Sequence, residues 1–195
     1  MDLTPARREI TTGRLLLQAG GEALADAVAD FQVRNRAHFA PWDPPTPESF
    51  HTATAQAERI RLGLKSFAEG AAFRYWLSPA NQPGRVIGSV HFSQVARGAF
   101  HSAVLGYSLD ERHQGQGLMH EALAASIEEM FSPRVNLHRL QAAHRPENLR
   151  SAAVLQRLGF RVEGLARDYL FIDGDWRDHV LTALTNPGFA EPADW

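Results

Sequence analysis

The sequence predicts one α+β domain built around a central sheet. Several short segments alternate apolar and polar residues, as strands with one buried face do, and three of them follow one another over residues 72–109 with short loops between them. Other segments carry apolar residues at a spacing of three to four, which is the helical period. The order of strand, helix, helix, three strands, helix, strand, helix and two strands is typical of helices packed on one sheet.

The first elements lie before residue 70. Residues 12–19 predict a short strand, and two glycines close it. Residues 22–37 predict a helix, because apolar side chains recur at helical spacing. The proline-rich stretch 39–47 cannot continue this helix, since proline removes a backbone donor and fixes φ. A second helix is expected over residues 48–69.

The remaining elements form a meander and then an alternation of helices and strands. The meander strands are 72–78, 86–95 and 103–109. After them we expect a helix over 118–131, a strand over 139–143, a helix over 148–158, and strands over 160–172 and 176–184. The turn signal Asp173-Gly174 predicts a hairpin between the last two strands. We expect a single domain over residues 1–195, with its core at about 10–186 and an irregular tail at 187–195.

Composition excludes several classes of protein. A length of 195 residues suits one domain with a sizeable core. The absence of cysteine excludes disulfides, cysteine-ligated metals and a cysteine nucleophile. A net charge of −2 argues against direct binding to nucleic acid or to an anionic membrane, since both require a basic face. With neither a signal-peptide pattern nor a long apolar run, we expect a cytoplasmic location and no membrane contact.

The nine histidines do not predict a metal site. The paired-histidine zinc motif is absent, and His113 and His120 lie seven residues apart across an expected loop–helix junction, not as a pair on one helix face. The nucleophile-elbow motif of serine hydrolases is absent as well.

The most informative local feature is the polar, glycine-containing loop between residues 109 and 118, which joins a strand to a helix. The first backbone N–H groups of a helix have no partner within it, and with the helix dipole they can cradle an anion. Gly115 and Gly117 would let a phosphate approach the backbone closely. The loop lacks the third glycine of a dinucleotide fingerprint and the lysine of a P-loop. Taken alone, it is equally consistent with a plain strand-to-helix turn.

A second motif about thirty residues later decides between these interpretations. The first motif reads Arg112-His-Gln-Gly115-Gln-Gly117, and the second contains Asn148, Ser151 and a final Gly159-Phe160. In this order and spacing they resemble the pyrophosphate loop and the following helix of the GCN5-related N-acetyltransferase (GNAT) superfamily. The resemblance implies the GNAT fold, a mixed central sheet of about six to seven strands with flanking helices. It also implies acetyl-CoA as co-substrate, with no metal.

Two further segments, 34–43 and 168–179, resemble the bacterial enzymes that acetylate the N-terminal alanine of ribosomal proteins (RimJ/RimL-like), most closely their RimJ branch. The similarity covers most of the chain. It implies that the acceptor partner is a protein N-terminus, such as that of a ribosomal protein. Whether the enzyme is a monomer or a homodimer stays open.

The resemblance also assigns the residues that would bind the cofactor. The backbone of the strand near Ser108 and Leu109 would pair with the pantetheine arm and hold the oxyanion. Asn148 would bond the same arm, although it also suits helix N-capping, and Arg150 would contact the adenosine phosphate. The loop that would bind the pyrophosphate comprises Arg112, His113, Gln114, Gly115, Gln116, Gly117, Leu118 and Met119.

For catalysis, the resemblance places an acidic residue beside a tyrosine, and here Asp168 precedes Tyr169. Asp168 is the candidate base and Glu163 its rival, against the alternative that either is simply solvated. Many GNAT enzymes have a tyrosine acid seven residues after the asparagine, where this chain has Leu155. Ser151 is therefore the candidate acid, although a serine in a first helical turn can equally serve the backbone.

The acceptor is expected to bind among aromatic residues of the first half, because large apolar side chains make suitable walls for a small pocket. The candidates are Phe39, Trp42, Trp76, His91 and Tyr169. Packing in the core is the alternative for the tryptophans and for His91.

Two other functions stay open. The acceptor could be a small-molecule amine or an antibiotic instead of a polypeptide. The missing tyrosine at position 155 also leaves room for an acyl-CoA-binding or ribosome-assembly module with little catalysis.

Overall fold

Eight strands form one mixed sheet in the computed structural model, which describes residues 5–191. The order across the sheet is β1-β2-β3-β4-β5-β6-β8-β7. Neighbouring strands are antiparallel except β5 and β6, which run parallel. The strands are β1 Glu9–Thr11, β2 Leu15–Gln18, β3 Phe73–Pro79, β4 Gly88–Ala96, β5 Ser102–Leu109, β6 Arg139–His144, β7 Arg161–Ile172 and β8 Asp175–Thr185.

The sheet has one strand more than the sequence predicts. The extra strand is β1, which has three residues and buries only Ile10. So short a segment shows no alternation, and it becomes a strand only because it pairs with β2 at the sheet edge. Residues 187–191 contain no helix or strand, and residues 1–4 and 192–195 of the expected domain lie outside the described chain.

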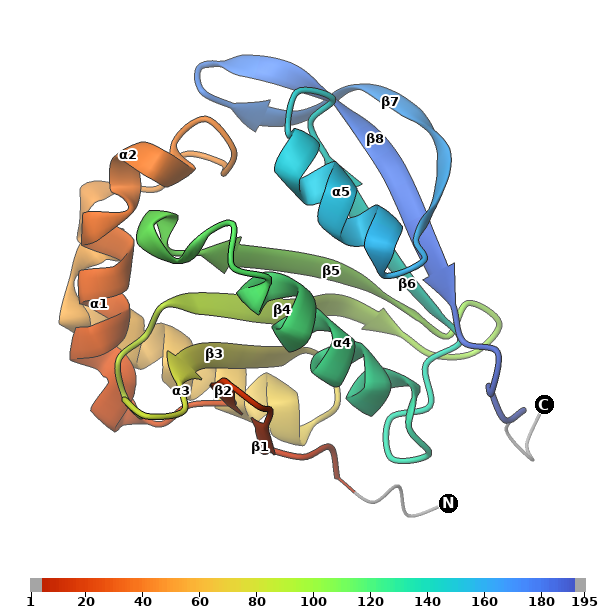
Figure 1. Ribbon diagram of the computed structural model, residues 1–195, viewed down its shortest axis with the longest axis horizontal. Coiled ribbons are helices and arrows are strands. Elements are labelled where there is room, and N and C mark those ends of the chain that lie inside the picture. The colour runs from red at the N-terminus through yellow and green to blue at the C-terminus, as the bar shows by residue number, and fades with distance from the viewer. Residues whose placement is uncertain (1–4, 192–195) are drawn as a thin grey trace.

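Helices cover both faces of the sheet. They are α1 Ala25–Arg34, α2 Arg36–Phe39, α3 Ala53–Ala68, α4 Leu118–Phe131 and α5 Leu149–Arg157, with short 3₁₀ turns at η1 Glu22–Leu24, η2 Glu48–His51 and η3 Glu111–His113. Figure 1 shows α4 and α5 in front of the sheet and α3 behind it. The last two strands form a long hairpin that arches over α5.

The single helix expected over residues 22–37 is divided in three in the structure. Asn35 separates α1 from α2, and its side chain is 3% exposed. The Asn35 amide donates to the Phe31 carbonyl oxygen at 2.9 Å and to Asp110 at 3.2 Å. Bonds from a buried asparagine to a distant loop compete with the regular helix, which a local pattern cannot reveal.

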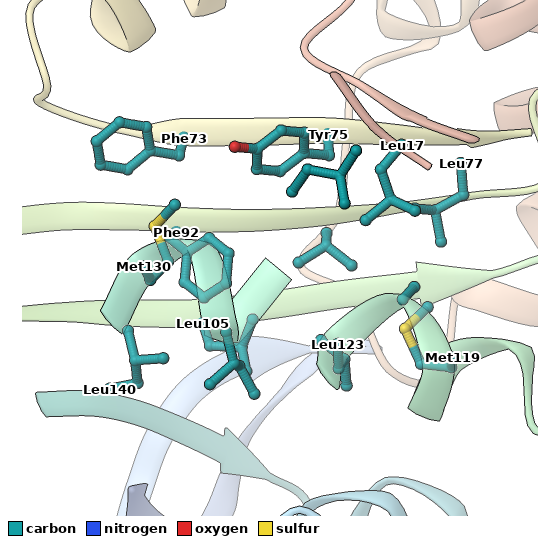
Figure 2. Packing of buried hydrophobic residues seen from close by; sticks show 14 of the residues in the cluster. Leu17, Phe73, Tyr75, Leu77, Phe92, Leu105, Met119, Leu123, Met130 and Leu140 are labelled. Atoms are coloured by element: carbon teal, nitrogen blue, oxygen red, sulfur yellow. The ribbon is translucent and has the colours of Figure 1, made fainter. Parts of the chain in front are cut away.

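The larger core lies between α4 and the front face of the sheet. Met119, Leu123 and Met130 of α4 pack with strand residues such as Phe92 and Leu105 (Figure 2). All five side chains are 6% exposed or less. Burying a side chain of this size contributes about 1.5–3 kcal/mol, so this contact fixes α4 and the loop before it.

A smaller core lies on the other face, between the sheet and α1 and α3. Val28, Phe31 and Ile60 from these helices pack around Trp76 and Val86 of the sheet side. The sheet therefore separates two layers of helices, and each face can carry a different part of a site.

Candidate active site

The parallel strands β5 and β6 pair over only part of their length. Their register runs from Ser102 opposite Arg139 to Leu105 opposite Ala142. The last four residues of β5, Gly106–Leu109, continue to pair with β4 but have no β6 partner in this register. One backbone edge of β5 is thus available to an added extended group, as in β-strand addition.

The loop after β5 ends at the N-terminus of α4. Gly115 and Gly117 have φ of 74° and 75°, a left-handed conformation that L side chains rarely adopt. Gly117 is the N-cap of α4, and no side chain caps this helix. The first N–H groups of α4 are therefore left for another acceptor, and an anion is the natural one.

Asp110 fixes the conformation of this loop through its hydrogen bonds. The carboxylate is buried and accepts from Arg34 Nε at 2.6 Å, from the backbone N–H of Arg112 at 3.0 Å and from His113 Nδ1 at 3.2 Å. Burial alone would raise the pKa of Asp110, but these hydrogen bonds and that from Asn35 outweigh burial and hold the pKa well below its ordinary value. Asp110 is therefore ionised, and it ties the end of α1 to the loop.

Gln114 connects the loop to two helices. Its side-chain amide is 2.7 Å from His38 Nε2, on α2, and its oxygen accepts from Arg150 of α5. Arg150 thus stands beside the glycine loop, and its contact with the adenosine phosphate stays a prediction. On the other side, Arg14 Nη1 donates to the Gln116 carbonyl oxygen at 2.9 Å.

The N-terminus of α5 faces the free part of β5. Asn148 Oδ1 accepts from the backbone N–H of Ser151 at 3.1 Å, which is the expected N-cap. The Ser151 hydroxyl lies 2.6 Å from Tyr107 Oη on β5. Burial raises the pKa of Tyr107 to about 12, against a lowering effect of the hydrogen bond with Ser151. Tyr107 is therefore a protonated phenol that can donate to Ser151.

These features belong to a known family. Residues 14–161 match the acetyltransferase (GNAT) domain. The chain belongs to the GNAT acetyltransferase family.

Two solved GNAT structures and a curated relative resemble the chain over most of its length. It is 42% identical over 178 residues to ribosomal protein uS5-alanine N-acetyltransferase of Escherichia coli (strain K12), a match that covers 91% of each. The ribosomal-protein-S5-alanine acetyltransferase of Vibrio fischeri superposes with a TM-score of 0.89 at 35% identity, covering 94% of this chain and 99% of that one. RimJ of Mycobacterium smegmatis, solved in complex with CoA-disulfide, gives a TM-score of 0.82 at 31% identity, over 92% and 85%.

These matches confirm the predicted family and the GNAT fold, with the strand β1 added. The roles predicted for single residues are not tested by them and stay predictions.

In this GNAT chain a core residue, Leu155, occupies the position where many family members have the tyrosine acid. Leu155 is 1% exposed and packs in the larger cluster. A hydroxyl from this position is therefore absent, and the phenol of Tyr107 reaches Ser151 from the sheet instead. Sequence reasoning missed Tyr107, because the contact joins two segments that no local pattern connects.

Asp168 and Tyr169 lie together on an irregular part of β7. The register shifts between Ala166 and Leu170, and Asp168 has φ of 47°. Its backbone N–H donates to Asp178 Oδ1 at 3.0 Å, while its own side chain is exposed. The ring of Tyr169 lies 5.3 Å from that of His179. The bulge thus leaves the Asp168 carboxylate exposed, and this carboxylate forms no ion pair with the residues that the structure describes.

The other carboxylates of this hairpin have partners. Glu163, the rival base, is paired with Arg139. Asp178 lies 2.6 Å from Arg167, and Arg177 stands within 4.0 Å of both Asp173 and Asp175. These pairs favour a structural role for all four.

The aromatic residues proposed for acceptor binding separate into two groups. Phe39 and Trp76 are 8% and 2% exposed and pack in the smaller core. Their burial favours a role in core packing, and a role in acceptor binding stays a prediction. Trp42 is half-buried, and the Arg145 guanidinium lies 5.5 Å from its ring centre. Arg145 also donates to the Pro41 carbonyl oxygen at 2.6 Å, which links the loop after α2 to the start of α5.

His91 lies on β4, and its ring rests against the backbone of β5. A Cβ added to Gly106 would lie 2.3 Å from its Cε1 atom, so only glycine fits opposite this ring. Burial, and then the charges of Arg74 and Arg59, lower the pKa of His91 to about 3. His91 is therefore neutral near pH 7, and it is a poor match for a base that must hold a proton there.

A further carboxyl group was missed by sequence reasoning. Asp43 follows Trp42, and desolvation by the surrounding protein raises its pKa to about 6. No sequence signal marks it, because the shift depends on how the loop is folded. Within residues 5–191 the structure contains no cluster of three His, Asp or Glu that could hold a metal ion. Nor is any helix in that range long and apolar enough to cross a membrane.

Proposed function

We propose that this acetyltransferase moves the acetyl group of acetyl-CoA to the α-amino group of a protein N-terminus, with an alanine-terminal ribosomal protein uS5 as acceptor. The observation that carries the proposal is the 42% identity to the Escherichia coli uS5-alanine enzyme, which extends over 91% of both chains. Similarity of this extent reaches beyond the GNAT domain of residues 14–161 into the segments that flank it.

The donor would bind along the free edge of β5. The N-terminus of α4 and the loop Arg112–Met119 offer backbone donors to the pyrophosphate. Arg150 stands beside this loop and would contact the adenosine phosphate. Gly106–Leu109 would pair with the pantetheine amides, and the complex of Mycobacterium smegmatis RimJ with CoA-disulfide supports this class of ligand.

The acceptor amine must be neutral to attack. An α-amino group has a pKa near ~7.8, so roughly a tenth of it is neutral at pH 7, against far less for a lysine amine with a pKa near ~10.4. A protein N-terminus therefore requires only modest help from a base. Asp168 is the proposed base, acting through water, and its exposed carboxylate is free to accept that proton.

The amine nitrogen forms a bond to the thioester carbonyl carbon in a ternary complex, since no cysteine is present to carry the acyl group. The carbonyl oxygen becomes negative and would be stabilised by a backbone N–H near Ser108 or Leu109. As the carbon–sulfur bond breaks, the Ser151 hydroxyl would donate to the leaving sulfur. Tyr107, at 2.6 Å, would supply a proton to Ser151 from behind.

A panel of peptides tests this function. The purified protein would be incubated with acetyl-CoA and peptides that begin with Ala, Ser, Thr or Met, and with N-blocked peptides that contain a free lysine. We expect intact mass to rise by one acetyl group on the alanine peptide only. Acetylation of lysine alone, or of none of the peptides, would contradict the proposal.

A further inference from the structure

A cavity lies between α3 and the back face of the sheet, away from the α4 side. Its volume is about 210 Å³. Charged and polar side chains from three elements reach it, namely Arg59 and Ser66 of α3, Arg74 of β3, and His91 and Ser93 of β4. Apolar residues such as Leu62 and Trp76 line the rest of the cavity, so its wall is mixed, with the charged groups among apolar ones.

The cavity carries positive charge that no carboxylate balances. Neither Arg59 nor Arg74 forms an ion pair within the described chain. Arg59 lies 4.3 Å from the ring centre of Phe50 and donates to Gln56 at 2.8 Å, while Arg74 lies 5.6 Å from the ring centre of Trp76. Burial, and then the charge of Arg59, lower the pKa of Arg74 to about 10, so it remains protonated at neutral pH.

His91, which also lines the cavity, has a ring nitrogen without a hydrogen-bond partner in the described chain. This nitrogen, Nδ1, is buried. A buried nitrogen left without a partner is unfavourable, and such groups in native proteins need an explanation. The stronger indication is the pair of guanidinium groups in the same cavity, which form no ion pair within the described chain and would suit an anion.

Gly63 keeps the cavity open on the helix side. It lines the cavity from the interior of α3, and a Cβ added there would meet no atom within 4 Å. Glycine inside a helix is less favourable than alanine, because it loses more backbone freedom on folding. The helix therefore carries an unfavourable residue at a position that lines the cavity, between Arg59 and Ser66.

The cavity lies next to the reaction site but on the opposite face from the pyrophosphate loop. His91 is directly opposite Gly106, where the free edge of β5 begins, and Arg74 is directly opposite His91. Adjacent strands lie ~4.8 Å apart, so Arg74 is ~10 Å from β5. An extended peptide advances about 3.3–3.6 Å per residue, and this distance corresponds to three residues.

We propose that this cavity binds the carboxylate of an aspartate or glutamate in the acceptor chain, at the third or fourth residue counted from the acetylated amine. Arg59 and Arg74 hold the carboxylate, and the ring of His91 forms the wall of the cavity on the β4 side. The inference rests on the proposed function, because it takes the acceptor to be a polypeptide end that lies across the back face of the sheet.

The test compares alanine-terminal peptides that differ only in one charge. A glutamate is moved through positions 2 to 6, and each peptide is paired with its glutamine counterpart. For positions 3 and 4 we expect kcat/KM to be about tenfold higher with glutamate, as for a charge-assisted hydrogen bond. We expect no preference at positions 2 and 6, and a smaller preference at higher ionic strength.

Three variants connect any preference to the cavity. Arg74→Gln should reduce the glutamate-to-glutamine ratio to about twofold or less. Gly63→Leu should have the same effect by filling the space, and since leucine favours a helix over glycine, this variant should remain folded. Arg61→Gln removes an equal charge from the exposed side of α3, where Arg61 pairs with Glu58, and should leave the ratio unchanged.

The outcomes separate the two proposals. Acetylation of all alanine peptides without regard to glutamate would overturn the acidic subsite and leave the N-terminal activity standing. A preference that persists in both Arg74→Gln and Gly63→Leu would also overturn it, since recognition would then lie elsewhere. Failure to acetylate any peptide end would overturn the proposed function itself.

Discussion

Tyr107 and Ser151 are 44 positions apart in the chain, yet their hydroxyl groups meet at 2.6 Å. Each comes from a different element, one from the free end of β5 and the other from the first turn of α5. The pair places a protonated phenol behind the serine that would face the leaving sulfur. Tyr107 on the sheet thereby provides a hydroxyl group, which the buried Leu155 on the helix lacks.

We predict that Tyr107→Phe lowers kcat about ten- to a hundredfold, because it removes the proton source of Ser151, and positioned acids contribute factors of this order or larger. Tyr107 is a positioning residue here, since it acts through Ser151. The KM for acetyl-CoA should change little, and steady-state kinetics with an alanine peptide would measure both.

Tyr75→Phe is the matched control for this variant. Tyr75 is another buried tyrosine of the sheet, and its hydroxyl donates to the Arg7 carbonyl oxygen at 2.8 Å, away from Ser151. Its loss should cost stability, about 1 kcal/mol as for one hydrogen bond, and leave kcat nearly unchanged. Equal kcat values in Tyr107→Phe and the wild type would rule out the relay.

At the scale of elements, the bulge of β7 determines how Asp168 is presented. Three residues of β7, Arg167–Tyr169, face Asp178 alone on β8, and the left-handed backbone at Asp168 is stabilised by the bond to Asp178. Hydrogen bonding, from Asp168 first and then from Arg167, lowers the pKa of Asp178. The bulge is therefore maintained by Asp178, which leaves the Asp168 side chain free for another task.

We predict that Asp168→Asn lowers kcat/KM several-fold at pH 7 and that the deficit shrinks as pH rises toward 9. Above the ~7.8 pKa of an α-amino group the acceptor is neutral without a base. Asparagine tolerates the left-handed conformation, and the backbone N–H that bonds Asp178 is retained, so the bulge should persist.

The measurement is a pH–rate profile with an alanine peptide, and Asp173→Asn, on the turn of the same hairpin, is the control. A deficit that is the same at every pH would assign Asp168 a structural role. Should Asp173→Asn show the same profile as Asp168→Asn, the effect would belong to the charge of the hairpin.

The elements show why the sequence predicts some features and misses others. The N-cap at Asn148 and the glycine N-cap at Gly117 depend on neighbouring residues only, so local patterns predict them. The break at Asn35 and the pairing of β1 depend on partners far along the chain. The link between Tyr107 and Ser151 is also non-local, and the resemblance supplied the serine but not the tyrosine.

At the scale of the whole molecule, the sheet separates the two anion sites that we propose. The α4 side offers helix-terminal N–H groups to phosphates, and the α3 side carries two unpaired arginines and His91. Only the assembled sheet brings β3, β4 and α3 around one cavity, so composition, with its net charge of −2, gives no sign of this local positive charge. The low pKa of His91 is a property of that assembly.

This arrangement makes the stability of the whole fold sensitive to acid. The pKa of His91 is lowered to about 3 in the folded state, against ~6.5 for an unfolded histidine. Below pH 6.5 the unfolded chain binds a proton that the folded chain does not, so the stabilisation present above pH 6.5 is lost as pH falls toward 3. Asp43 has the opposite effect on stability. Because its pKa is raised, the folded chain binds a proton at a higher pH than the unfolded chain does, which favours the folded state as pH falls.

We therefore predict that the free energy of unfolding of the wild type falls, between pH 7 and pH 5, by up to about 2 kcal/mol more than that of His91→Gln. The variant lacks the titrating ring, while Asp43 and every other carboxyl group contribute equally to both proteins. Urea unfolding at the two pH values would measure the difference. Parallel losses in wild type and variant would mean that His91 is protonated in the folded state, and the cavity around it would then be far better solvated than its buried Nδ1 indicates.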